Sequence, residues 1–119
     1  MAVIDSNIII DYLSGFSSAK KEMEFHRNPA VSIITWIEVL VGAKNKDEER
    51  FARDYLAQFE TIGMSDEVAE HSILLRKSHK LRLPDAIIWA TALAQNTILV
   101  TRNTKDFPKD DPSIRIPYK

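Results

Sequence analysis

Short apolar runs alternate with amphipathic segments along the chain, and this alternation restricts the fold more than any other feature of the sequence. The apolar runs predict strands at residues 2–4, 31–34, 60–63, 97–100 and 114–116. The segments between them predict helices at residues 8–13, 17–27, 35–43, 51–59, 65–80 and 84–95. Because strands that alternate with helices are typical of a parallel, helix-covered sheet, we expect an α/β fold. The central sheet should be mainly parallel, with four or five strands and helices on both faces.

The length and composition of the chain limit the number of domains and exclude several kinds of site. We expect residues 1–119 to form a single domain, since this length is typical of one. The chain has no cysteine, which excludes disulfides, thiolate zinc sites and cysteine nucleophiles. A formal net charge of -1 predicts no overall attraction to nucleic acid, so any such contact must be local. The lack of a secretory signal and of a long apolar run predicts a cytoplasmic protein with no membrane contact.

Acidic and amide side chains follow the predicted strands or begin the predicted helices. Asp5 comes directly after the first strand, and Glu38 lies in the first turn of the helix after the second. Asp85 lies in the first turn of the last predicted helix, and Asn103 and Asp106 follow the next strand. Because the carboxyl ends of parallel strands meet at one edge of a sheet, we expect these side chains to form an acidic pocket. Carboxylates in a cleft take up protons or bind a cation, and oxygen ligands without His or Cys favour Mg2+ or Mn2+.

Each of these residues also has a purely structural interpretation. Thr35 and Glu38 have the spacing of a capping box, in which Glu38 would reach back to the start of its helix. Asp85 could complement a helix dipole, and Asp5 could be a helix N-cap. The functional interpretation is favoured because these acids all lie beyond the carboxyl ends of strands, where α/β folds have their active sites.

Four segments carry a resemblance to a known family. They are VIDSN at 3–7, SIITWIE at 32–38, LPDAIIWATA at 83–92 and LVTRNTKDF at 99–107. In this order they resemble the PIN domain, and more narrowly the VapC-type toxin ribonucleases of bacterial and archaeal toxin–antitoxin pairs. The resemblance covers nearly the whole chain.

The resemblance implies an activity and a set of site residues. It implies a Mg2+-dependent endoribonuclease, the toxin of a type II VapBC-like system, which hydrolyses RNA phosphodiester bonds by metal-activated water; Mn2+ would substitute. The implied catalytic residues are Asp5, Glu38 and Asp85. Asp5 and Asp85 would also hold the metal, together with Asn103 at the fourth position of the family and Asp106 three residues further on. Asn103 or Asp106 could equally serve that position, and the structural alternative for Asp106 is a turn.

Further residues are candidates for contact with the substrate. Thr101 matches a family position whose hydroxyl orients a carboxylate or a phosphate, although it could simply end a strand. Residues 76–82 are rich in Lys and Arg and run directly into the Asp85 motif. We expect Arg82, with Arg102 and Lys105, to flank the acidic pocket and hold the phosphate backbone. The alternative for the basic segment is a solvated helix end.

The resemblance also implies partners: an RNA substrate, a cognate antitoxin and a second copy of the chain. Apolar residues at 8–13 and 36–40 predict a groove for an amphipathic C-terminal segment of the antitoxin. Helix 84–95, with Trp89 and Leu93, is a candidate surface for a homodimer. The alternative is that all of these residues belong to the core.

Two other functional classes compete with the nuclease. A catalytically weak PIN-like module that binds RNA or protein is favoured by Asn103, because a neutral amide binds a cation less well than a carboxylate. A receiver-like signalling domain would need a phosphoacceptor Asp after its central strand, and no Asp follows residues 31–34.

Overall fold

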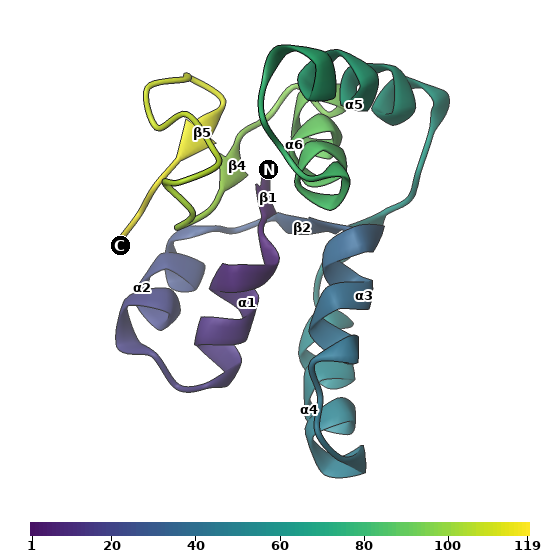
Figure 1. The fold of residues 1–119 in the computed structure, drawn as a ribbon. Helices are drawn as coiled ribbons and strands as arrows, with labels where there is room; N and C mark the ends of the chain where they lie inside the picture. Colours follow the sequence, from purple (N-terminus) through teal and green to yellow (C-terminus); the bar gives the residue numbers. More distant parts are fainter.

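A five-stranded sheet forms the centre of the computed structural model, which describes residues 1–119 (Figure 1). The strands lie in the order β3-β2-β1-β4-β5, and every neighbouring pair is parallel. Their bounds are β1 (Ala2–Ile4), β2 (Pro29–Ser32), β3 (Glu60–Ile62), β4 (Leu99–Val100) and β5 (Ile114–Arg115). The predicted α/β class is therefore confirmed, with five strands in the sheet.

Six helices cover both faces of this sheet. They are α1 (Ser6–Leu13), α2 (Ser17–Phe25), α3 (Ile33–Val41), α4 (Lys46–Leu56), α5 (Asp66–Ser78) and α6 (Leu83–Ala94). Val3 of β1 packs in a core with α5 and α6, whereas its neighbours Ala2 and Ile4 pack in a second core with α1, α3 and α4. Because alternate side chains of a strand point to opposite faces, β1 is buried on both sides, as parallel strands require.

Helix α3 begins earlier than the sequence predicts. The apolar run 31–34 is divided: Ser32 ends β2, and its hydroxyl caps α3 by accepting a hydrogen bond from the amide of Ile34 at 3.1 Å. Glu38 therefore lies in the second turn of α3, and the predicted capping box is wrong. The hydroxyl of Thr35 is buried and has no partner. A short apolar run does not distinguish a strand from a helix, and here the capping serine sets the boundary.

The apolar character of residues 35–43 predicts a helix buried between layers, and this prediction is also wrong. Only Thr35 and Val39 of α3 are buried, and Val41 is 79% exposed. Helices α3 and α4 lie side by side and extend away from the sheet (Figure 1). One face of this helix pair remains open to solvent.

Several side chains predicted to form partner surfaces belong to the core instead. Ile8 and Ile9 are fully buried, and Trp89 is 1% exposed, with its indole N–H donating to the hydroxyl of Ser113 at 2.9 Å. Leu93 is half-buried against the core. Trp89 therefore offers no surface to a second copy. No helix has the length and apolar character needed to cross a membrane.

Candidate functional site

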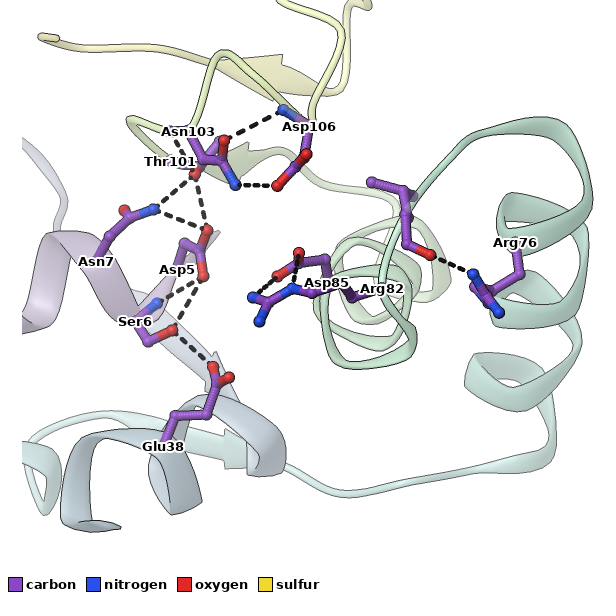
Figure 2. Close-up of polar contacts among 11 residues, drawn as sticks. Asp5, Ser6, Asn7, Glu38, Arg76, Arg82, Asp85, Thr101, Asn103 and Asp106 are labelled. Atoms are coloured by element: carbon purple, nitrogen blue, oxygen red, sulfur yellow. Dashed lines mark hydrogen bonds and ion pairs between the residues drawn. The ribbon is translucent and has the colours of Figure 1, made fainter. Parts of the chain in front are cut away.

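Asp5 lies at the carboxyl end of β1 and is held by four neutral donors (Figure 2). Its Oδ1 accepts hydrogen bonds from the amide of Ser6 at 2.7 Å and from the hydroxyl of Ser6 at 3.2 Å. Its Oδ2 accepts from the Thr101 hydroxyl at 2.7 Å and the Asn7 amide group at 3.2 Å. Thr101 reaches Asp5 because β1 and β4 are parallel neighbours that pair Ile4 with Val100. Asp5 is also the N-cap of α1, so its predicted structural role coexists with its place in the site.

The Asp5 carboxyl is 3% exposed, and its surroundings disfavour ionisation. Burial raises the pKa of Asp5 from 3.8 to about 6, and the negative charge of Asp85 adds to this effect. Hydrogen bonds from Thr101 and Ser6 act in the opposite direction without cancelling it. The fold therefore places a carboxylate where it lacks a counter-ion, and a bound cation would stabilise its charged form.

Glu38 joins this network through a serine. The Ser6 hydroxyl lies 2.7 Å from Oε1 of Glu38 and 3.2 Å from Oδ1 of Asp5, so it bridges two carboxylates. Glu38 comes from α3 and Ser6 from α1, and their contact joins the two helices at the sheet edge. From the sequence, Asn7 matches the polar position that follows the first Asp in the family, and Ser6 could form a hydrogen bond nearby, but both residues suit a helix start equally well. In the structure both donate hydrogen bonds to Asp5.

Asp85 is buried and faces the same space from the first turn of α6. Its partner is Arg82, whose Nε lies 3.2 Å from Oδ2 of Asp85. The Arg82 side chain is 71% exposed. The hydrogen bond and charge of Asp85 raise the pKa of Arg82, and the charges of Glu38 and Asp106 add to this effect. Arg82 thus lies in the field of three carboxylates, next to the one it pairs with.

Asn103 and Asp106 bind each other in the loop after β4. The Asn103 amide group donates to Oδ2 of Asp106 at 3.0 Å, and the Asp106 backbone amide donates to Oδ1 of Asn103 at 3.2 Å. The Asn103 backbone amide donates to the Thr101 hydroxyl at 3.1 Å. This reciprocal pair forms a turn, as the structural interpretation of Asp106 predicts, and it also brings both side chains to the edge of the carboxylate cluster (Figure 2).

Arg102, a predicted substrate contact, is engaged elsewhere. Its Nε lies 2.6 Å from Oδ2 of Asp11 on α1, and the Tyr118 hydroxyl donates to the same oxygen at 2.9 Å. Asp11 and Tyr118 cannot be found as partners from the sequence, because 91 residues separate Asp11 from Arg102 and no local pattern links them. Asp11 thus neutralises the Arg102 charge near the site.

Together the acidic side chains form what we call the carboxylate cluster: Asp5, Glu38, Asp85 and Asp106. Figure 2 shows them pointing toward one another from β1, α3, α6 and the loop after β4. No three acidic or histidine side chains lie close enough together to chelate one ion as they stand. Mg2+ needs fewer protein ligands, because it commonly keeps several waters and binds through one or two carboxylates. Asp5 and Asp85 are the candidates for two such ligands, because the charge of Asp85 acts on Asp5 and raises its pKa.

The PIN domain family matches residues 2–110 of the chain. The chain belongs to the PIN domain family. A chain of a toxin–antitoxin complex from Klebsiella pneumoniae is 46% identical, with a TM-score of 0.93, over 100% of this chain and 99% of that one. Ribonuclease VapC1 of Methanocaldococcus jannaschii is 27% identical over 112 residues, which are 90% of this chain and 79% of that protein.

More distant solved structures share the PIN fold. VapBC2 from Rickettsia felis, bound to a promoter DNA fragment, is 24% identical with a TM-score of 0.79, over 95% of this chain and 94% of that one. At this identity the likeness shows the fold alone. The family match and the fold similarity thus agree on the PIN fold of this chain.

Proposed function

We propose that this PIN domain is a Mg2+-dependent endoribonuclease that acts in the cytoplasm as the toxin of a VapBC-like toxin–antitoxin pair. The observation that carries the proposal is the buried Asp5 carboxyl, whose pKa is raised to about 6 by burial and by the charge of Asp85. The similarity to a chain of a toxin–antitoxin complex and to a protein named ribonuclease supports the same function.

Each residue of the cluster has a separate part in the proposed reaction. Asp5 and Asp85 would hold a divalent ion, which would supply Lewis acidity to the phosphate and lower the pKa of a bound water. Glu38 positions the attacking water in line with the leaving 3'-oxygen. Ser6 and Thr101 fix the carboxylates of Glu38 and Asp5 by hydrogen bonds. Arg82 leaves Asp85 and turns its exposed guanidinium to a phosphate oxygen of the RNA.

RNA cleavage with analysis of the products tests this proposal. The purified chain should cut RNA in the presence of Mg2+ or Mn2+, and EDTA should stop the cut. Because water attacks instead of the neighbouring 2'-hydroxyl, the products should carry a 5'-phosphate and a 3'-hydroxyl. A 2',3'-cyclic phosphate would contradict the mechanism. RNA binding without any cleavage would instead favour the catalytically weak binding module.

The apolar groove between α1, α3 and α4 supports the proposed antitoxin partner. This groove has a volume of about 430 Å3 and is lined mainly by apolar side chains, among them Ile10, Leu13 and Phe51. Ile10 is 44% exposed and Phe51 is 60% exposed. An amphipathic helix places its apolar face in a groove of this kind. The C-terminal segment of the antitoxin, made as a peptide, should bind the wild-type chain and lose affinity for Phe51→Glu.

A second copy of the chain is proposed to bind at α5 and α6. The surface differs from the one predicted from the sequence, which was centred on Trp89 and Leu93. Three exposed apolar side chains line a depression of about 400 Å3 there: Met64, Ile73 and Leu83. Such a patch is typical of an interface between subunits. Light scattering should give the mass of a dimer for the wild-type chain and of a monomer for Ile73→Glu.

A further inference from the structure

A second groove, of about 560 Å3, lies between the end of α5 and the loop that follows β4. We call it the lysine groove, because four lysines line it: Lys80, Lys105, Lys109 and Lys119. The acidic residues in its lining are Asp106 and Asp110. Lysines outnumber aspartates there, although the chain as a whole has a net charge of -1. The groove is therefore the kind of local cationic surface that a contact with a polyanion requires.

The positive charges of the lysine groove are not neutralised within the molecule. Each of the five ion pairs of the chain involves an arginine or a histidine, and none involves a lysine. By contrast, the arginines near the cluster are engaged: Arg82 with Asp85, Arg102 with Asp11, and Arg76 with the carbonyl of Leu81. The lysines are thus the cations near the site that are available to a ligand without breaking a contact.

The lysine groove adjoins the carboxylate cluster at Asp106. Asp106 lines the groove and is also hydrogen-bonded to Asn103 at the edge of the cluster (Figure 2). Its charge acts on Arg82, the partner of Asp85. A nucleic-acid strand cut at the cluster would therefore continue into the groove, where its neighbouring phosphates would contact the lysines.

The lining of the groove provides charge and hydrogen-bonding groups but no surface for stacking a base. Its one hydrophobic residue, Phe107, is 1% exposed and packs its ring against Trp89. The His79 ring packs edge-on against the same indole. Proteins that read single-stranded bases use exposed aromatic rings, whereas lysines contact phosphates without reading sequence. The chemistry of the groove therefore suits a phosphodiester backbone.

We propose that the lysine groove binds the phosphates of an RNA strand beside the bond that is cut, through Lys80, Lys105 and Lys109. This inference rests on the proposed nuclease function and adds the path of the substrate to it. The lysines hold the strand in place without selecting its sequence. Arg82, released from Asp85, contacts the phosphate at the cluster itself.

Charge-neutralising variants of the groove test this proposal. The triple variant Lys80→Gln, Lys105→Gln and Lys109→Gln is compared with a matched triple variant on other surfaces, Lys20→Gln, Lys21→Gln and Lys46→Gln. All six lysines are exposed and none is ion-paired. Both sets carry Asp5→Asn to prevent cleavage. Binding of a labelled single-stranded RNA of about twelve nucleotides is measured by fluorescence anisotropy over a range of NaCl concentrations.

The groove variant should bind RNA at least about tenfold more weakly than the matched variant, and its salt dependence should also decrease. Each lost phosphate contact on a single strand lowers the slope of log K against log salt by about 0.7, so three contacts give about 2. Replacing the same three lysines by arginine should retain the affinity, which separates loss of charge from loss of folding. Equal affinity and equal slope in the groove and matched variants would overturn the proposal.

Cleavage assays separate this inference from the nuclease proposal on which it rests. In the active background, the groove variant should show its defect as a raised KM for RNA. Cleavage by the wild-type chain with no difference in KM between the groove and matched variants would overturn the groove alone. Groove-dependent binding of RNA with no cleavage by the wild-type chain would overturn the nuclease and leave the groove as an RNA-binding surface.

Discussion

The two buried aspartates of the cluster, Asp5 and Asp85, are stabilised in opposite ways. Asp5 accepts hydrogen bonds only from neutral groups, which come from the start of α1 and the end of β4. Asp85 is paired with a full positive charge, the exposed guanidinium of Arg82 next to the start of its helix. The fold therefore fixes the orientation of Asp5 but leaves it without a counter-ion, whereas Asp85 has a counter-ion that can be exchanged. We call Asp5 and its hydrogen-bond donors the rigid half of the site, and Asp85 with Arg82 the adjustable half.

The largest expected effect is the loss of cleavage when either aspartate is neutralised. Asp5→Asn and Asp85→Asn should each lower kcat for RNA by about 100- to 1000-fold, because each removes a preorganised electrostatic contribution of about 3–4 kcal/mol. Asp54→Asn, at an exposed position of α4, is the matched control and should cleave like the wild-type chain. Cleavage retained by Asp5→Asn would show that the rigid half is structural.

The second prediction distinguishes the two aspartates by the pH dependence of stability. Since the pKa of Asp5 is about 6 in the folded chain and its ordinary value is 3.8, the folded chain binds more protons than the unfolded chain between these values. The free energy of unfolding should therefore fall as pH rises through this window, by about 3 kcal/mol from Asp5. The contribution is complete below pH 3.8 and lost above about pH 6.

Urea denaturation of the wild-type chain and of Asp5→Asn over this pH range, without metal, measures the effect. The difference between the two curves isolates Asp5 from other carboxylates such as Glu22. Although Glu22 is buried, hydrogen bonds from Arg115 and His26 lower its pKa, so its contribution has the opposite sign. Asp85→Asn should keep most of the pH dependence that Asp5→Asn loses, because burial is the main cause of the raised pKa of Asp5 and the charge of Asp85 a smaller one. Parallel curves for the wild-type chain and Asp5→Asn would contradict the prediction.

The rigid half of the site was the more predictable half, for a physical reason. Asp5 follows a short buried strand and begins a helix, and both features are local in sequence. The parallel order of the strands then requires Thr101, at the end of β4, to lie beside it. The strand–helix alternation was sufficient for the architecture, and the family resemblance was needed to select Thr101.

The Arg102 contact and the start of α3 could not be predicted from the sequence. The residues around 31–34 suit a strand or a helix equally well, and only the hydrogen bond from Ile34 to Ser32 settles the boundary. The sequence predicts that Arg82 and Arg102 contact the substrate, but in the folded chain each forms an ion pair with an aspartate. The Arg82–Asp85 pair has the local i,i+3 spacing, which permits an ion pair without requiring one. The Arg102–Asp11 pair joins residues 91 positions apart and depends on a tertiary contact that no local pattern encodes. That the lysines of the groove form no ion pair is likewise a property of the folded chain that no local pattern shows.

The third prediction concerns the hydroxyl that fixes the rigid half. Thr101→Val removes a buried donor to Asp5 and an acceptor for the amides of Asn7 and Asn103. Leaving such groups unpaired costs about 1–3 kcal/mol, so the melting temperature should fall and cleavage should drop by about tenfold or more. Because one of the hydrogen bonds that lower the pKa of Asp5 is lost, that pKa should rise above about 6.

A second buried threonine provides the control for this variant. The Thr91 hydroxyl donates to the carbonyl of Ile87 on its own helix and forms no hydrogen bond with a site residue. Thr91→Val therefore tests the same change of side chain without the cluster, and should leave cleavage and the Asp5 titration unchanged. Equal losses of cleavage in Thr91→Val and Thr101→Val would show that Thr101 acts only through stability.

The smallest predicted effect concerns the adjustable half. If Arg82 balances the charge of Asp85 in the absence of an ion, then Arg82 and a divalent cation compete for the same oxygens. Arg82→Gln should then bind Mn2+ about two- to fivefold more tightly by calorimetry without RNA, since an exposed ion pair contributes at most about 1 kcal/mol. Arg53→Gln, which removes the exposed pair with Glu49 on α4, should leave Mn2+ affinity unchanged.

The same Arg82→Gln variant should bind RNA more weakly, because the guanidinium that leaves Asp85 is the one proposed to contact the phosphate. Tighter metal binding together with weaker RNA binding is the combination that competition requires, whereas unchanged Mn2+ affinity would mean that Arg82 and the ion occupy different sides of Asp85.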